Sequence, residues 1–112
     1  MKIRVKETEI KINKGIASFL EKKIKKLEKF FPSEAEVIIE AELGLASLHH
    51  QKGDVYRAEV QIIMPGKKIW RAVSQKNNLR SAIIGAVEDL ETQLRKRKES
   101  FIAQRKKASE NK

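Results

Sequence analysis

Two long segments of the chain carry apolar residues at the three- and four-residue spacing of an α-helix. The later one runs from Leu79 to Leu94 and keeps its apolar residues on a single stripe. The earlier one follows Asn13, a typical helix N-cap, and is expected to end at Pro32, because a prolyl ring disfavours helical geometry in the preceding residue. Its stripe consists of Ile16, Phe19, Leu20, Ile24, Leu27 and Phe31.

Four shorter segments alternate apolar and polar residues, which is the period of a β-strand with one buried face. In the first of them, Ile3 and Val5 are expected to face the core. In the last, Trp70 and Ala72 are expected to face it, because this choice buries the tryptophan and leaves Arg71 in water. The four segments cover residues 2–6, 35–43, 55–64 and 68–74.

The resulting order of elements, β-α-β-β-β-α, predicts an α+β fold. Two helices with one apolar stripe each need one apolar sheet face to cover, and four strands supply it. We therefore expect a four-stranded sheet with two helices on one face, an arrangement like that of the double-stranded-RNA-binding domain. Pro65-Gly66 predicts the hairpin between the last two strands, and a loop is expected around residues 47–54. The domain is expected to span 1–101, followed by a basic tail at 102–112 that is frayed or disordered.

The overall charge is strongly basic. The 112 residues include 25 Lys and Arg against 15 Asp and Glu, which gives a net charge of +10. Such an excess favours polyanionic partners, nucleic acid first and an anionic membrane surface second. No apolar run approaches the roughly 20 residues that cross a bilayer, and the N-terminus does not resemble a signal peptide. We therefore expect a cytoplasmic protein without a membrane partner.

The basic residues are concentrated in the two predicted helices, whereas the middle strands are rich in glutamate. Because both helices cover the same side of the sheet, we expect a basic helical side and a largely acidic sheet. An ordinary soluble surface intersperses the two signs, whereas segregation is typical of a surface that docks onto phosphates. The expected RNA-binding residues are Lys22, Lys23, Lys25, Lys26 and Lys29 on the first helix and Arg80, Arg95, Lys96, Arg97 and Lys98 on the second.

The few aromatic residues fall almost entirely on predicted core faces, so no exposed platform for stacking single-stranded bases is expected. The remaining mode of nucleic-acid binding is recognition of the phosphate backbone of a folded RNA by Lys and Arg. The sequence offers no support for catalysis: it has no cysteine, no paired carboxylates in an apolar setting and no phosphate-cradling glycine loop. The only histidines, His49 and His50, are adjacent and make a poor metal pair. No enzyme activity, metal, cofactor or small-molecule substrate is therefore expected.

Local motifs in this order resemble the ribosome hibernation-promoting factor family, also called ribosome-associated inhibitor or ribosomal subunit interface protein. The family shows I-x-I-T before its first helix and K-x-x-K-L-E-x-F at the end of it, and this chain reads IKIN at 10–13 and KIKKLEKF at 23–30. In its last helix the family shows L-x-x-Q-L-x-K-x-K, and the chain reads LETQLRKRK at 90–98. Ala58-Glu59-Val60 and Pro65-Gly66 resemble the family's third strand and hairpin. The family's D-x-Y-x-A-I-D at the start of the last helix is replaced by NLRSAII at 78–84.

This resemblance implies a non-catalytic factor that binds the small ribosomal subunit near the tRNA and mRNA sites and inhibits translation in stationary phase or stress. The long form of the family has an additional C-terminal dimerisation domain. This sequence shows no counterpart of it, so the resemblance implies a short form. We expect such a factor to be monomeric off the ribosome. Two alternatives remain open. The chain is either a general binder of structured RNA, or a protein-interaction module that pairs its last helix with a partner through Leu90, Leu94, Phe101 and Ile102.

Overall fold

The computed structural model describes residues 1–32, 35–46, 55–66 and 68–110, with side chains up to Arg97. The loop predicted around residues 47–54, with His49 and His50, lies outside the described residues. The other elements fall close to their predicted positions, and the α+β fold with the order β-α-β-β-β-α is confirmed.

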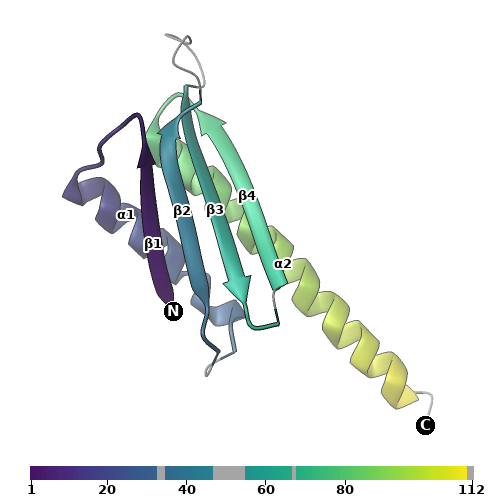
Figure 1. Cartoon of the computed structure of the whole chain (residues 1–112). Helices are drawn as coiled ribbons and strands as arrows, with labels where there is room; N and C mark the ends of the chain where they lie inside the picture. The colour runs from purple at the N-terminus through teal and green to yellow at the C-terminus, as the bar shows by residue number, and fades with distance from the viewer. Residues whose placement is uncertain (33–34, 47–54, 67, 111–112) are drawn as a thin grey trace.

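One four-stranded mixed sheet forms the front of the molecule, and both helices cover its back (Figure 1). The strands lie in the order β1-β2-β3-β4, so the first and last strands form the two edges. β1 pairs parallel with β2, whereas β3 is antiparallel to both of its neighbours. The elements are β1 (Lys2–Thr8), α1 (Lys14–Lys25), the short 3₁₀ helix η1 (Glu28–Phe30), β2 (Ile38–Leu45), β3 (Tyr56–Met64), β4 (Lys68–Lys76) and α2 (Leu79–Glu110).

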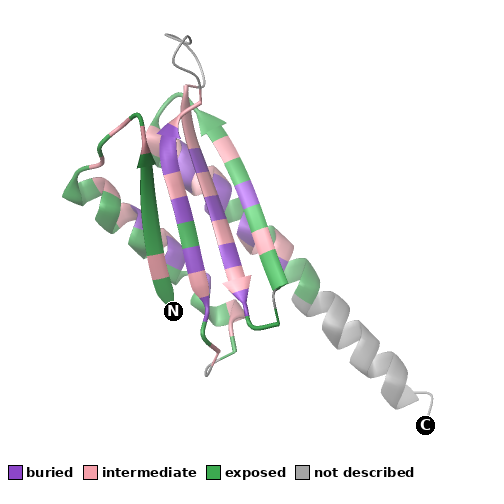
Figure 2. Ribbon diagram, viewed as in Figure 1, coloured by how far each residue is buried: buried purple, intermediate pink, exposed green. Residues whose placement is uncertain are grey.

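The core lies between the two central strands and the helices, because alternate residues of β2 and β3 point toward the helical layer (Figure 2). Their register sets Ile39 opposite Ile62 and Ala41 opposite Val60, and all four residues are buried. The predicted stripes of both helices meet this face. They contribute Leu20, Ile24, Leu27, Ala82, Ile83, Ala86, Val87, Leu90 and Leu94 to the buried core.

The predicted hairpin joins β3 to β4. Gly66 has a φ of 83°, a left-handed conformation that glycine adopts without steric cost. The turn brings Met64 opposite Lys68, and the register that follows buries Ala72 and half-buries Trp70 while Arg71 stays exposed. The predicted orientation of this strand is therefore confirmed.

The first helix ends earlier than predicted, at Lys25 instead of immediately before Pro32. After Lys25 the chain tightens into η1, where the Phe30 N–H donates to the Leu27 carbonyl at 3.0 Å. This tighter turn keeps Leu27 fully buried and packs Phe30 against the core. Burial of apolar side chains, and not proline, therefore decides where α1 ends.

The predicted burial of β1 is wrong for Val5, which is 44% exposed, and only partly right for the half-buried Ile3. Both side chains do point to the helical side, where they line a groove between β1 and α1. α1 packs toward α2 and leaves β1 largely uncovered, so the apolar face of this strand is only partly shielded.

α2 is the longest element, with 32 residues. At 1.5 Å per residue it measures about 48 Å, and it continues well past the end of the sheet (Figure 1). The helix thus passes Phe101, where the sequence predicts a boundary. The division into a domain at 1–101 and a tail at 102–112 stays a prediction.

Candidate nucleic-acid interface

The lysines of α1 are positioned by the cap and the apolar stripe of this helix. Asn13 is extended, and its Oδ1 accepts a hydrogen bond from the Ile16 N–H at 2.8 Å, which confirms the predicted N-cap. Leu20 and Ile24 then fix the inner face, so Lys22 and its neighbours point outward. Lys22, Lys23 and Lys25 lie in the last turn, where the helix dipole favours positive charge.

Arg80 lies in the first turn of α2, directly after a second capping asparagine. The Asn78 Oδ1 accepts a hydrogen bond from the Ser81 N–H at 2.8 Å. The dipole at a helix N-terminus disfavours a cation, but the Arg80 guanidinium carbon lies 5.0 Å from the centre of the Phe19 ring on α1. A Cβ placed on Gly15 would lie 3.7 Å from Arg80 Nη2, so the first turn of α1 is also adjacent to this guanidinium.

Phe19 binds a second cation. The Lys23 Nζ lies 5.4 Å from the same ring centre, one turn further along α1. A cation over an aromatic face at this distance is attracted by the negative face of the ring. Phe19 therefore joins a cation of α1 to a cation of α2 across the helix pair.

Positive charge is crowded at this junction. The neighbouring Lys26 ammonium, together with partial desolvation, lowers the pKa of Lys23, and Glu88 on α2 only partly offsets this effect. The positive charge beside Lys23 makes this junction a favourable place for an anion, because one phosphate relieves the repulsion on that ammonium. We name Lys22, Lys23, Lys26 and Arg80 the helix-junction cations.

A second group of cations is already paired with carboxylates. Glu91 accepts from Arg95 at 2.8 Å and lies 3.6 Å from the Lys29 Nζ, so one carboxylate bridges η1 and the middle of α2. Lys25 pairs with Glu21 at 3.6 Å within α1. Exposed pairs of this kind contribute about 0.2–1 kcal/mol each, so phosphates can replace these carboxylates at little cost.

The remaining predicted residues lie on α2 beyond these pairs. Within the described residues, Lys96 is exposed and forms no ion pair. The Arg97 guanidinium carbon lies 4.9 Å from the centre of the Trp70 ring, on the side of α2 that faces β4. Lys98 belongs to α2, but its side chain lies outside the described set. Of the predicted residues, the structure brings Lys23 and Arg80 together on Phe19, and Lys29 and Arg95 together on Glu91. Lys25 instead lines the groove beside β1, and Arg97 lies over Trp70.

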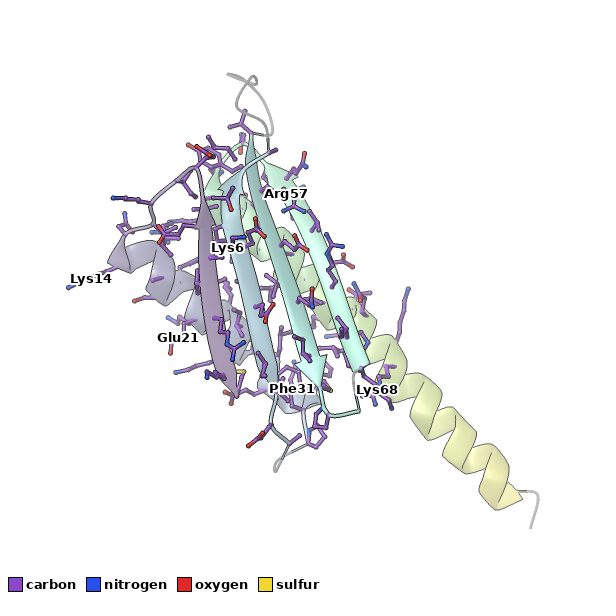
Figure 3. The ribbon with its side chains drawn as sticks, in the orientation of Figure 1. Lys6, Lys14, Glu21, Phe31, Arg57 and Lys68 are labelled. Atoms are coloured by element: carbon purple, nitrogen blue, oxygen red, sulfur yellow. The ribbon has the colours of Figure 1, made fainter. Side chains whose placement is uncertain are left out.

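The open face of the sheet is not acidic, so the predicted segregation of charge is wrong for this face. Arg4 pairs with Glu40 at 3.7 Å, and Arg57 and Arg71 both pair with Glu59. Figure 3 shows Lys6 and Arg57 over the strands on this face. The strand order explains the difference, because β1 and β4 bring their basic residues beside the glutamates of β2 and β3. The helical layer does keep its excess, with ten Lys and Arg against five Asp and Glu in 14–30 and 79–97.

Sequence reasoning missed the residues that organise this surface. The apolar stripe predicts Phe19 only as a core residue, but its ring also contacts Lys23 and Arg80. Glu91 was not considered, although it joins Lys29 to Arg95. A Phe followed four residues later by Lys is a helical pair that the sequence offers. The contact with Arg80 comes from the packing of the two helices and has no local signal.

Other kinds of site receive no support from the described part of the chain. It contains no group of three or more His, Asp or Glu side chains placed to hold a metal ion. No helix in this part is long and apolar enough to cross a membrane.

A sequence model of the family described as sigma 54 modulation protein / S30EA ribosomal protein matches residues 3–101 of the chain. This match covers most of the 112 residues. The chain belongs to this family. The match spans α1, nearly all of the sheet and α2 up to residue 101, so the fold described above is that of an S30EA family domain.

Solved structures support the same assignment. The N-terminal domain of Thermus thermophilus Protein Y is 30% identical, with a TM-score of 0.70 over 86% of this chain and 98% of that domain. A ribosomal subunit interface protein from Coxiella burnetii has the same fold at 20% identity, with a TM-score of 0.68 over 88% of this chain and 98% of its own. No curated protein matches this chain at a significant level.

Proposed function

We propose that this protein binds the small ribosomal subunit through the phosphates of its RNA and inhibits translation, as a non-catalytic cytoplasmic factor of ribosome hibernation during stress. Membership of the S30EA family over residues 3–101 carries the proposal. The proposed site is near the tRNA and mRNA sites, where a bound protein excludes these ligands sterically. The protein acts as a monomer off the ribosome.

The helix-junction cations are the proposed centre of the RNA contact. Lys23 and Arg80 are held on one aromatic ring, so little side-chain freedom is lost when they bind a phosphate. The Lys26 ammonium beside Lys23 lowers the pKa of that lysine, and a phosphate between the two removes the cause. The capped first turns of both helices lie next to Arg80 and add the positive ends of two helix dipoles.

The outer cations extend the contact along α2. Lys29 and Arg95 exchange Glu91 for phosphate oxygens, and Lys96, Arg97 and Lys98 continue the basic surface toward the end of the helix. If six to ten of these residues each neutralise a phosphate, affinity falls by about 10³- to 10⁵-fold between 50 and 200 mM salt. A salt dependence this steep distinguishes phosphate contacts from apolar protein–protein contacts.

The test is co-sedimentation of the purified protein with bacterial ribosomes and separated subunits at 50 and 200 mM salt. An in vitro translation assay accompanies it. The variant is Lys22→Gln/Lys26→Gln at the helix junction. The matched control is Lys2→Gln/Lys6→Gln on β1, which removes the same charge from the opposite face of the sheet. We expect wild type and control to bind the small subunit at low salt and to inhibit translation, and the helix-junction variant to lose about tenfold or more in affinity, since about one phosphate contact per lysine is lost.

Equal losses in both double variants would mean that net charge, and not the helical surface, determines binding. Binding to the large subunit only, or to structured RNA without preference for ribosomes, would replace the proposal by general RNA binding. A dimer that is insensitive to salt and does not bind ribosomes would favour the protein-interaction module.

A further inference from the structure

The two edges of the sheet are protected unequally. At β4, the Gln93 side chain of α2 donates to the Arg71 carbonyl at 3.0 Å, and Arg97 covers Trp70. At β1, the Lys2 N–H donates to the Val37 carbonyl at 2.9 Å, so the even-numbered residues bond to β2. Since backbone groups alternate sides along a strand, the N–H and C=O of Ile3 and Val5 point to the outer edge. No backbone bond in the described chain joins these two residues to another segment on that side.

A groove of about 430 Å³ lies beside this unpaired edge. It is lined next to β1 by the apolar residues Met1, Ile3, Val5, Ala17 and Leu20, and along α1 and η1 also by Glu21, Lys25 and Glu28, of which Glu21 and Lys25 pair with each other. α1 extends outward past β1 (Figure 1), so the helix lies behind the space next to this edge strand. Met1 and Val5 are large apolar residues of the kind usually found in a core, but each is 44% exposed. The outer edge of β1 therefore has unpaired backbone groups, a groove beside it and α1 behind it, which together can accept one more strand.

The charged residues of β1 determine which side chains are favoured on an added strand. Lys2, Arg4 and Lys6 point to the open face, and the register sets Arg4 beside Glu40 and Lys6 beside Glu42 on the inner side. An added strand places its own residues beside the same three cations on the outer side. Opposite charges across neighbouring strands are stabilising, and like charges are destabilising. Acidic residues are therefore favoured on that face, and apolar residues on the face that enters the groove.

A second copy of this chain does not meet these requirements. If two β1 strands pair at their edges, the basic side chains of one copy face those of the other. A nucleic acid strand satisfies the charges, but it makes no use of the apolar groove or of the backbone groups of Ile3 and Val5. An acidic peptide satisfies all three features.

We propose that the outer edge of β1 is a binding site for an extended segment of a partner protein in which acidic and apolar residues alternate, added to the sheet as a fifth strand. Its apolar side chains enter the groove beside Ile3 and Val5, and its carboxylates pair with Lys2, Arg4 and Lys6. The groove includes Lys25 but none of the helix-junction cations, and the proposal does not depend on the proposed ribosome binding. Addition of a strand to a sheet edge is a general mode of peptide recognition.

The test measures binding of three labelled peptides to the full chain by fluorescence anisotropy, with amide hydrogen exchange as a site-specific readout. The peptides are EVEVEVE, the scrambled EEEVVVE and the basic KVKVKVK. We expect EVEVEVE to bind best, to bind more weakly at high salt and to slow exchange of the Ile3 and Val5 amides. Val5→Asn is expected to weaken this binding about tenfold, because it removes roughly one apolar side chain from the contact.

Val73→Asn on β4 is the matched control, since Val73 is 41% exposed and lies at the other edge of the sheet. It is expected to leave the affinity unchanged. Equal binding of the scrambled peptide, preference for the basic peptide, or unchanged exchange at Ile3 and Val5 would overturn the proposal. A concentration-dependent dimer that protects the same amides would assign the edge to a second copy and would also overturn it.

Discussion

The guanidinium carbon of Arg80 lies 5.0 Å from the centre of the Phe19 ring, so a cation of α2 rests on an aromatic side chain of α1. Lys23 approaches the same ring at 5.4 Å. One half-buried phenylalanine thus contacts one cation from each helix. Stability and charge placement depend on the same contact.

Replacing this ring separates the two cations. Phe19→Leu keeps an apolar side chain but removes both cation–π contacts, each worth about 0.5–1 kcal/mol. We expect the free energy of unfolding, measured with urea, to fall by about 1–2 kcal/mol, and ribosome binding to weaken. Phe30→Leu is the control, because its ring has only Lys29 over it, at 5.2 Å. A larger effect of Phe30→Leu on ribosome binding would contradict the role of Phe19.

Charge reversal on the helical layer is expected to change binding without changing folding. Lys26→Glu and Lys96→Glu alter exposed side chains, and such substitutions usually change stability by no more than about 0.5 kcal/mol. Each lost phosphate contact lowers the slope of log affinity against log salt by about 1. Sedimentation with small subunits across a salt series measures the slope, and thermal unfolding checks the fold. An unaltered slope would remove these two residues from the interface.

A Cβ at Gly44 is expected to be costly. It would overlap the Thr8 carbonyl oxygen and lie 2.9 Å from the Thr8 Cβ, because Thr8 is the register partner of Gly44. Because backbone must move, we expect Gly44→Ala to lower the free energy of unfolding by about 2–3 kcal/mol. Gly85→Ala meets the Ser74 hydroxyl, which can rotate away, and its Cβ would lie 3.1 Å from the Ser74 Cβ, a tight contact that needs only a small shift. Alanine also favours helix over glycine by about 1 kcal/mol. Urea unfolding should therefore rank Gly44→Ala well below Gly85→Ala, and the reverse order would be inconsistent with this packing.

The ion pairs of Glu59 predict a pH dependence of stability. Partial burial raises the pKa of Glu59, but hydrogen bonds and charge from Arg71 and Arg57 outweigh this and lower the pKa below its usual value. A lowered carboxyl pKa contributes stability above the unfolded value of about 4.3, and this contribution is lost as the pH falls through the folded value.

We therefore expect Glu59→Gln to destabilise the protein near pH 7 and to have progressively less effect below about pH 4. Urea unfolding across this range gives the difference between the two proteins. Adding Arg71→Gln to Glu59→Gln should cost less than Arg71→Gln alone, because the two side chains interact directly. A pH-independent difference would show that the ion pairs do not set the pKa of Glu59.

Features with a local cause could be predicted from the sequence. Asn13 caps α1 because its short side chain reaches the Ile16 N–H, and Gly66 allows the turn that aligns β3 with β4. Trp70 faces the helices because burial of its ring outweighs that of Ile69, which is 55% exposed. Each of these outcomes depends on residues within a few positions of one another.

Features that depend on distant neighbours could not be predicted. The exposure of Val5 follows from the packing of α1 toward α2, which the β1 sequence does not encode. The mixed charge of the open sheet face follows from the strand order, because Arg4 and Glu40 are far apart in sequence and adjacent in space. The candidate site divides in the same way: the stripes indicated which lysines point outward, but not that Lys23 and Arg80 share one ring.

Glu91, held between Lys29 and Arg95, is a carboxylate that a phosphate must displace in the proposed RNA contact. This costs only about 0.2–1 kcal/mol per ion pair, but a single phosphate has few new contacts to offset the loss of two pairs. A rigid RNA surface that presents several phosphates at once displaces Glu91 and fills the helix junction in one event. If the surface binds RNA as proposed, the internal carboxylate is a small threshold that favours a target whose phosphates are fixed in space over loose polyanions.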